Sequence, residues 1–160
     1  MVSGAWDVAA GTPDPELPLV TIGELGILRD LDETADGVVV TITPTYSGCP
    51  AMREITADLT GRLAAAGYRA VEIRTRLAPP WSSDWITAGG RAKLQAAGIA
   101  PPGPKPSGPI RLTLGPRPAV PCPRCGSSDT AASADFGSTA CKSLHRCRAC
   151  AEPFEAVKAI

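Results

Sequence analysis

Aromatic residues, histidine and net charge are all scarce in this sequence. Phe, Trp and Tyr make up 4% of the 160 residues, there is one histidine, and 16 basic side chains balance 16 acidic ones. The C-terminal residues 122–160 are also near neutral, with five basic and four acidic side chains. Nucleic-acid-binding proteins usually present a strongly basic face. The composition therefore predicts that nucleic acid is not the main partner.

Long apolar runs and an export signal are lacking as well. A membrane-spanning helix needs about 18 to 20 consecutive apolar residues, and no stretch of the sequence approaches that length. The first 20 residues lack the cationic segment and apolar run that are typical of a signal peptide. Six cysteines without an export signal favour metal binding or reactive thiols over disulfides. We therefore expect a cytoplasmic protein with no membrane partner.

Proline and glycine, in contrast, are abundant and unevenly spread. Of the 17 prolines and 16 glycines, eight and four fall in the 24 residues Gly98–Pro121, a composition typical of a semi-rigid, extended linker. Within it Ile110, Leu112 and Leu114 alternate with polar residues, which predicts one short strand. We predict a first domain over residues 1–98, a linker over 99–121 and a second domain over 122–160.

The first domain is organised around the stretch that contains Cys49. The β-branched run Val38–Ile42 predicts a buried strand, Thr43–Gly48 a loop, and the residues after Cys49 a helix. The helix has an apolar face and a glycine that can end it: Met52, Ile55, Leu59, Leu63 and Gly67. Cys49 is expected close to the helix N-cap, where unpaired amides and the helix dipole favour a thiolate. The alternative is a small buried residue that happens to be cysteine.

Two further strands complete the predicted sheet. Ile27–Asp32 alternates apolar and charged residues and precedes an Asp-Gly turn, so we expect an antiparallel hairpin with Val38–Ile42. Tyr68–Leu77 also alternates and predicts a half-buried strand. A right-handed crossover through the helix would set this strand parallel to Val38–Ile42. The first domain is therefore expected to contain a small mixed sheet.

Shorter helical segments are predicted around this sheet. Ala5–Ala10 can form a short helix, and Thr21 with Glu24 matches a capping box that starts a helical turn. A serine at position 82 or 83 can cap another helix, which we expect to run to Ala97 and to end at the following glycine.

The second domain contains two Cys-x-x-Cys motifs separated by 21 residues, formed by Cys122, Cys125, Cys147 and Cys150. Each motif offers two sulfurs to one ion, and the intervening residues can form a hairpin that brings the motifs together. The tail has too few apolar residues to fold by burial alone, whereas structural zinc supplies on the order of 10 kcal/mol. We predict Zn²⁺ in preference to a rubredoxin-like iron. Because four cysteines leave no open coordination position, the site should be structural and not catalytic. The expected fold class is α+β: a small mixed β-sheet with packing helices, a Pro/Gly-rich linker and a C-terminal zinc ribbon.

Cys141 and His145 lie between the two motifs and are candidates for additional ligands. For His145, an exposed or partly packed hairpin position is favoured over metal ligation. For Cys141 three interpretations stay open. It could be a substitute ligand, a contact cysteine on the ribbon surface, or one of a pair with Cys49.

Three motifs of the first domain together resemble one known family. Asp14–Glu16, the run Thr43–Pro50 and Pro79–Trp81 resemble the small iron–sulfur assembly family that includes SufT-like proteins. With the ribbon Cys122–Phe154 attached, the chain resembles the PaaD family, whose members belong to the bacterial phenylacetyl-CoA epoxidase complex. The resemblance implies an α+β fold in which the cysteine loop lies exposed beside the Asp-Pro-Glu segment.

The resemblance also implies a role in cofactor assembly. It makes Cys49 a working thiol that transiently ligates iron or an iron–sulfur cluster, with Asp14, Glu16, Thr43 and Thr45 near it. The implied partners are the oxygenase and the iron–sulfur flavin reductase subunits of the epoxidase system. On this interpretation the chain is an accessory maturation subunit and not an enzyme alone; a structural subunit without maturation chemistry is the alternative. Whether the chain forms a homo-oligomer stays open.

Overall fold

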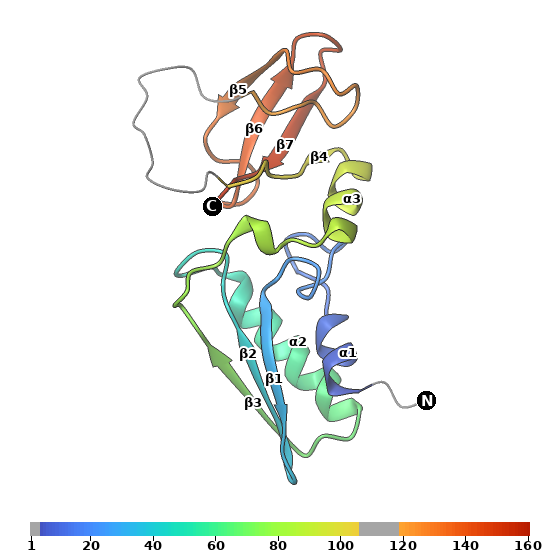
Figure 1. The fold of residues 1–160 in the computed structure, drawn as a ribbon, viewed down its shortest axis with the longest axis vertical. Helices are drawn as coiled ribbons and strands as arrows, with labels where there is room; N and C mark the ends of the chain where they lie inside the picture. The colour runs from blue at the N-terminus through green and yellow to red at the C-terminus, as the bar shows by residue number, and fades with distance from the viewer. Residues whose placement is uncertain (1–3, 106–118) are drawn as a thin grey trace. The chain divides into compact units, whose positions relative to one another are not determined.

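The computed structural model describes residues 4–105 and 119–160 (Figure 1). The chain divides into two compact units, the first ending at Gly90 and the second beginning at Arg91. Each described unit contains one β-sheet, and helices accompany the sheet of the first unit, so the α+β class is confirmed. The strand predicted at Ile110–Leu114 lies outside the described residues. Among the described residues, no helix is long and apolar enough to cross a lipid bilayer.

The described part of the first unit contains a three-stranded mixed sheet in the order β1-β2-β3. β1 (Leu28–Glu33) pairs antiparallel with β2 (Gly37–Ile42), and β2 pairs parallel with β3 (Ala70–Thr75), both as predicted. The central β2 is almost completely buried, whereas the residues of β3 are half-buried or exposed because it lies at the edge. The predicted extension of this strand to Leu77 is wrong. Leu77 lies beyond the strand and is 59% exposed.

Two helices cover one face of this sheet. α1 (Ala5–Ala10) contacts β1, α2 (Ala51–Ala65) contacts β3, and the two helices contact each other (Figure 1). The buried face of α2 consists of Ala51, Ile55, Leu59 and Leu63. Met52, predicted on this face, is only half-buried. After the helix, Gly67 has φ 103°, a left-handed conformation that glycine adopts without strain.

The helix predicted from position 82 or 83 to Ala97 is interrupted. Ser83–Trp85 forms a 3₁₀ turn, and α3 begins only at Ala88 and ends at Ala96. Between them Ile86 is extended, with ψ 122°, and the Thr87 amide donates a 2.8 Å hydrogen bond to the Glu24 carbonyl. An amide that pairs with a carbonyl so far away in the chain cannot continue a local helix, so the tertiary contact explains the break.

Two sequence motifs secure the loops of the first unit. In the predicted capping box, the Thr21 amide donates to Glu24 Oε2 at 3.0 Å, and the Glu24 amide donates to Thr21 Oγ1 at 3.2 Å. Trp81, from the Pro-Pro-Trp motif, is 3% exposed, and its Nε1 donates to the Leu25 carbonyl at 3.0 Å. The indole is therefore a core residue whose polar atom is satisfied.

The second unit contains a sheet whose described strands follow the order β4-β7-β6-β5. β5 (Thr130–Ala134) and β6 (Lys142–Cys147) form the predicted hairpin between the two Cys-x-x-Cys motifs, and β7 (Pro153–Val157) pairs antiparallel with β6. β4 (Ile99–Ala100) pairs parallel with β7. The first two residues of the predicted linker are thus part of the ribbon sheet, because β7 offers them a free edge.

The core of the second unit is small and includes two of the cysteines. It consists of Ala100, Cys122, Cys147, Phe154 and Ala156. One aromatic ring and four small side chains bury little apolar surface. This agrees with the expectation that burial alone is insufficient to fold the ribbon.

Candidate thiol site and metal centre

Cys49 lies in the loop between β2 and α2. α2 begins at Ala51 with Pro50 as the N-cap residue, so Cys49 lies one residue before the N-cap, close to it as predicted. The Cys49 amide donates to the Tyr46 carbonyl at 3.2 Å, and Gly48 has φ 84°, which lets the chain turn into the helix. The Cys49 side chain is half-buried, so the sulfur lies at the rim of the first unit.

The surroundings of Cys49 raise the pKa of its thiol. Burial is the main cause; a hydrogen bond from the Ala51 amide opposes it, and the negative charge of Glu16 adds to it. Hydrogen bonds with the side chains of Thr45 and Tyr46 also favour the thiolate, but burial and Glu16 outweigh them. The direction of this pKa shift is opposite to the one that the position before the helix alone favours. The Ala51 amide at the start of the helix does lower the pKa of the Cys49 thiol, but burial and Glu16 outweigh it.

The Asp14-Pro15-Glu16 segment brings a carboxylate close enough to act on this thiol. Asp14 is 5% exposed, and its Oδ1 accepts hydrogen bonds from the amides of Glu16 at 2.9 Å and Leu17 at 2.8 Å. A side chain that bonds the backbone in this way fixes a turn. Asp14 thus shapes the loop, and Glu16 is the member of the pair whose charge reaches Cys49.

Three hydroxyl residues of the cysteine loop, Thr43, Thr45 and Tyr46, differ in what they contact. Thr43 is 1% exposed, and its amide donates to the Ile27 carbonyl at 2.8 Å, so Thr43 anchors the start of the loop. Thr45 and Tyr46 both hydrogen-bond the Cys49 thiol through their side chains. The sequence prediction did not include Tyr46. Its place three residues before Cys49, in the same Pro/Gly-bounded loop, was the signal available.

In the second unit the four motif cysteines converge. The sulfur atoms of Cys122, Cys125, Cys147 and Cys150 all lie within 4.8 Å of one another. The Cys122–Cys150 and Cys125–Cys147 sulfurs are 3.8 and 3.6 Å apart. Four thiolates around one tetrahedral zinc, each at about 2.3 Å, would have their sulfurs about 3.8 Å apart. The donor set therefore fits a single Zn²⁺ ion.

Hydrogen bonds from backbone amides order the two motifs that form this tetrathiolate cluster. The pKa of Cys147 is lowered to about 7, chiefly by a hydrogen bond from the Cys150 amide. In the first motif the Gly126 amide donates to the Cys122 carbonyl at 2.9 Å, and Gly126 has φ 74°. Each motif is thus a tight turn, and in the second motif the Cys147 sulfur is disposed to lose its proton to a metal. Its neighbours in the cluster raise the pKa of Cys125, and they raise that of Cys150 to about 12.

Neither Cys141 nor His145 belongs to the cluster within the described residues. Cys141 is 8% exposed, and its sulfur lies 3.1 Å from Thr139 Oγ1. His145 stacks on Phe154, with ring centroids 5.4 Å apart, and its Nε2 lies 2.9 Å from Ser143 Oγ. Burial lowers the pKa of His145. Both candidates for additional ligands are therefore packed within the hairpin.

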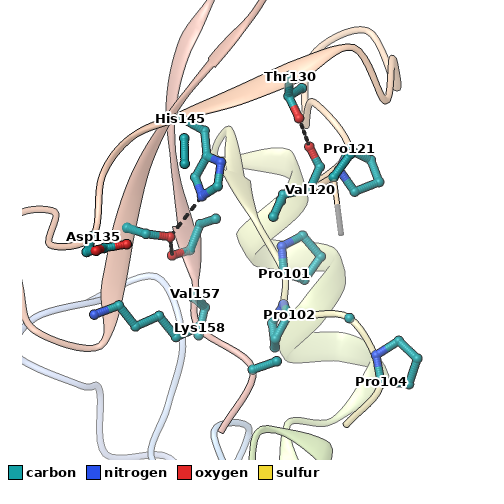
Figure 2. A pocket seen from close by; sticks show the side chains of 16 residues that line it. Pro101, Pro102, Pro104, Val120, Pro121, Thr130, Asp135, His145, Val157 and Lys158 are labelled. Atoms are coloured by element: carbon teal, nitrogen blue, oxygen red, sulfur yellow. Dashed lines mark hydrogen bonds between the residues drawn. The ribbon is translucent and has the colours of Figure 1, made fainter. Parts of the chain in front are cut away.

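His145 and Ser143 also line a pocket of about 930 Å³ in the second unit (Figure 2). Figure 2 shows prolines 101, 102 and 104 of the segment after β4 on the opposite side. None of the four cluster cysteines is among the described residues that line this pocket. The pocket and the metal centre are therefore separate features of the ribbon.

Comparison with known proteins assigns each half of the chain. The family model described as "Iron-sulfur cluster assembly protein" matches residues 10–74, and the one described as "PaaD zinc beta ribbon domain" matches residues 106–158. A protein of Escherichia coli (strain K12), named as the D component of a "Putative 1,2-phenylacetyl-CoA epoxidase", is 40% identical over 155 residues. This alignment covers 97% of the chain and 91% of the relative.

Solved structures resemble the first part of the chain. A crystal structure of a DUF59 domain of unknown function from Bacillus anthracis is 27% identical, with a TM-score of 0.52 over 56% of this chain and 87% of that one. A Mycobacterium tuberculosis protein, described as associated with Fe-S complex assembly and repair, is 30% identical over 59% of this chain and 81% of that one. Its TM-score is 0.31.

The fold and the cysteine cluster define a two-part protein, an iron–sulfur assembly domain followed by a zinc ribbon. The chain belongs to the PaaD family of phenylacetyl-CoA epoxidase subunits.

Proposed function

We propose that the chain is an accessory subunit that matures the phenylacetyl-CoA epoxidase system by assembling or delivering iron or an iron–sulfur cluster. The observation that carries this proposal is the half-buried thiol of Cys49 on a loop of the iron–sulfur assembly domain, with the Glu16 carboxylate near it. The soft sulfur of Cys49 and the hard carboxylate oxygen of Glu16 are a donor pair that suits transient binding of iron. The chain itself would not catalyse epoxidation.

The raised pKa of Cys49 fits transient metal handling. Without metal the thiol keeps its proton, which protects it from oxidation and alkylation. An arriving iron cation would reverse this preference. Its positive charge is attracted by Glu16, and the Fe–S bond forms as the thiol proton is released to solvent. Thr45 and Tyr46, which already hydrogen-bond the sulfur, would orient it.

The ribbon in this proposal is a structural and docking module. Cys122, Cys125, Cys147 and Cys150 would hold one Zn²⁺ that stabilises the fold, because a tetrathiolate site leaves no position open for substrate. The partners would be the oxygenase and the iron–sulfur flavin reductase of the epoxidase system, since the relative is named as part of an epoxidase. Thiols in these roles require a reducing compartment, the cytoplasm.

One observation favours the alternative, a structural subunit without maturation chemistry. Cys49 is half-buried, and its burial is the largest of the effects on its thiol, as expected of a residue that packs a loop. On that interpretation Cys49 only packs the loop between β2 and α2. The two functions differ in whether iron ever binds at Cys49.

Metal analysis of protein purified without air tests the proposal. Wild type should contain about one zinc per chain plus additional iron, with or without sulfide. Cys49→Ser should keep the zinc and lose the iron, because serine retains the shape but not the soft donor. Cys141→Ser is the matched control and should keep both metals. Equal iron in wild type and Cys49→Ser would refute the proposal.

A further inference from the structure

Strand β3 forms an edge of the first unit's sheet. Within residues 4–105 and 119–160 it pairs only with β2, and Figure 1 shows it as an outer strand. The pairing with β2 continues without irregularity from Ala70 to Thr75. All six side chains are half-buried or exposed. β3 therefore presents a regular, accessible edge.

The main-chain groups on this edge can be assigned. The Arg76 amide donates to the Ile42 carbonyl of β2 at 2.8 Å, so the main-chain amide of Arg76 points toward β2. The direction of the main-chain N–H and C=O groups alternates from one residue to the next along a strand. The main-chain groups of Glu72 and Arg74 therefore also point toward β2. The amides and carbonyls of Val71, Ile73 and Thr75 then point away from β2. Each of these residues offers one donor and one acceptor to a further strand.

The opposite edge of the sheet is less suited to pairing. β1 contains an irregularity between Leu28 and Asp30, and its second half is acidic, with Asp30, Asp32 and Glu33. Bulges and repeated charges of one sign are the usual protection of an edge strand. β3 has neither feature, because Glu72 alternates with the basic Arg74 and Arg76 along one face.

We infer that β3 pairs antiparallel with β3 of a second copy of this chain, with Ile73 opposite Ile73. In this register Glu72 of each copy lies opposite Arg74 of the other, once on each side of the two-fold axis. These are non-hydrogen-bonded positions, where opposed side chains come closest. Val71 lies opposite Thr75, so the outward main-chain groups meet in hydrogen-bonded pairs. The result is a continuous sheet through the dimer.

Other symmetric registers are disfavoured by charge. Centring the pair on Glu72 or Arg74 would oppose like charges at the axis itself. Centring it on Thr75 would oppose Arg74 and Arg76, while centring it on Val71 would leave Glu72 opposite Ala70. Glu72 and Arg74 already form a 2.7 Å ion pair within one chain, with side chains 58% and 60% exposed. They are therefore accessible to the second copy.

Charge reversal tests this dimer with the zinc-loaded full chain in sedimentation equilibrium. Wild type should sediment as a dimer. Glu72→Arg and Arg74→Glu should each weaken dimerisation by about tenfold or more, because each change opposes like charges at two symmetric positions. Mixing the two variants should restore a dimer, since every opposed pair then has opposite signs. The double variant with both changes should also dimerise as wild type does.

Two more variants distinguish pairing through the β3 edge from a general effect of changing surface charge. Arg62→Glu breaks an exposed ion pair with Asp58 on α2 and should leave the dimer intact. Thr75→Pro removes an outward amide without touching the bonds to β2, and it should weaken the dimer as strongly as the charge changes. A monomeric wild type, or a dimer insensitive to both the charge and proline variants, would overturn the inference. The inference does not depend on the proposed maturation role, because sedimentation measures mass without iron or epoxidase partners.

Discussion

Lys142 and Glu155 form an ion pair between β6 and β7, with Nζ and Oε2 2.9 Å apart. The Lys142 side chain is 4% exposed and that of Glu155 is 23% exposed. The other carboxylate oxygen of Glu155 accepts a 2.6 Å hydrogen bond from the Ser138 amide. One carboxylate therefore neutralises a buried ammonium and secures the hairpin loop that precedes Cys141.

We predict that Glu155→Gln lowers the free energy of unfolding of the zinc-loaded protein by about 2 kcal/mol, because it leaves Lys142 buried without a counter-charge. Chemical denaturation followed by a ribbon signal measures the loss. Asp129→Asn is the matched control, since the Asp129–Arg148 pair is 3.7 Å long and mostly exposed, and it should cost less than about 0.5 kcal/mol. Similar losses for both variants would contradict the prediction.

The Glu155 pair should also make ribbon stability depend on pH. Burial alone would raise the pKa of Glu155, but the hydrogen bonds from Ser138 and the charge of Lys142 outweigh it and hold the pKa below its ordinary value of 4.5. The stabilisation is thus fully present above about pH 4.5 and is lost as the pH falls through the folded pKa. The difference in stability between wild type and Glu155→Gln should shrink over that interval. A constant difference down to the lowest pH would contradict the assignment.

Removing the metal should unfold the ribbon and leave the first unit folded. The cluster cysteines hold the small core together, and two of them belong to it. Cys150→Ser should release the zinc and abolish amide protection in β5, β6 and β7, as measured by hydrogen exchange. Cys141→Ser should retain both zinc and protection. A ribbon that stays protected without zinc would refute a structural role for the ion.

Glu16→Gln should accelerate alkylation of Cys49 by iodoacetamide at a pH of about 8. Burial is the main cause of the raised pKa and would remain, but removing the negative charge of Glu16 lowers the pKa and increases the thiolate fraction. Mass-resolved labelling gives the rate at Cys49 separately from the other cysteines. Glu54→Gln, in the first turn of α2, is the control and should leave the rate unchanged. Unchanged labelling in Glu16→Gln would mean that Glu16 does not act on the thiol.

Features with a local cause could be predicted from the sequence. The hairpin into Val38–Ile42, the apolar face of α2 and the hairpin between the two cysteine motifs follow from residue alternation and spacing. The tetrathiolate cluster follows from the Cys-x-x-Cys turns.

Features set by distant segments could not be predicted. The helix break at Thr87 depends on the Glu24 carbonyl, and β4 forms because β7 offers it a parallel edge. The raised pKa of the Cys49 thiol depends on burial and on Glu16, from a loop before the sheet. The position of Cys49 before a helix favours a thiolate, because only the nearby helix amide can be foreseen from the sequence. The burial of the thiol and the charge of Glu16 cannot.

The central claim, that Cys49 matures the epoxidase components, is tested most directly by counting iron in those components. Cells in which Cys49→Ser replaces wild type should assemble the complex, but their oxygenase or reductase should be purified with less than its full iron, and phenylacetyl-CoA epoxidation should be lost. Cys141→Ser cells should yield fully metallated proteins. Oxygenase and reductase that are fully loaded with iron in Cys49→Ser cells would contradict the claim and leave a purely structural role.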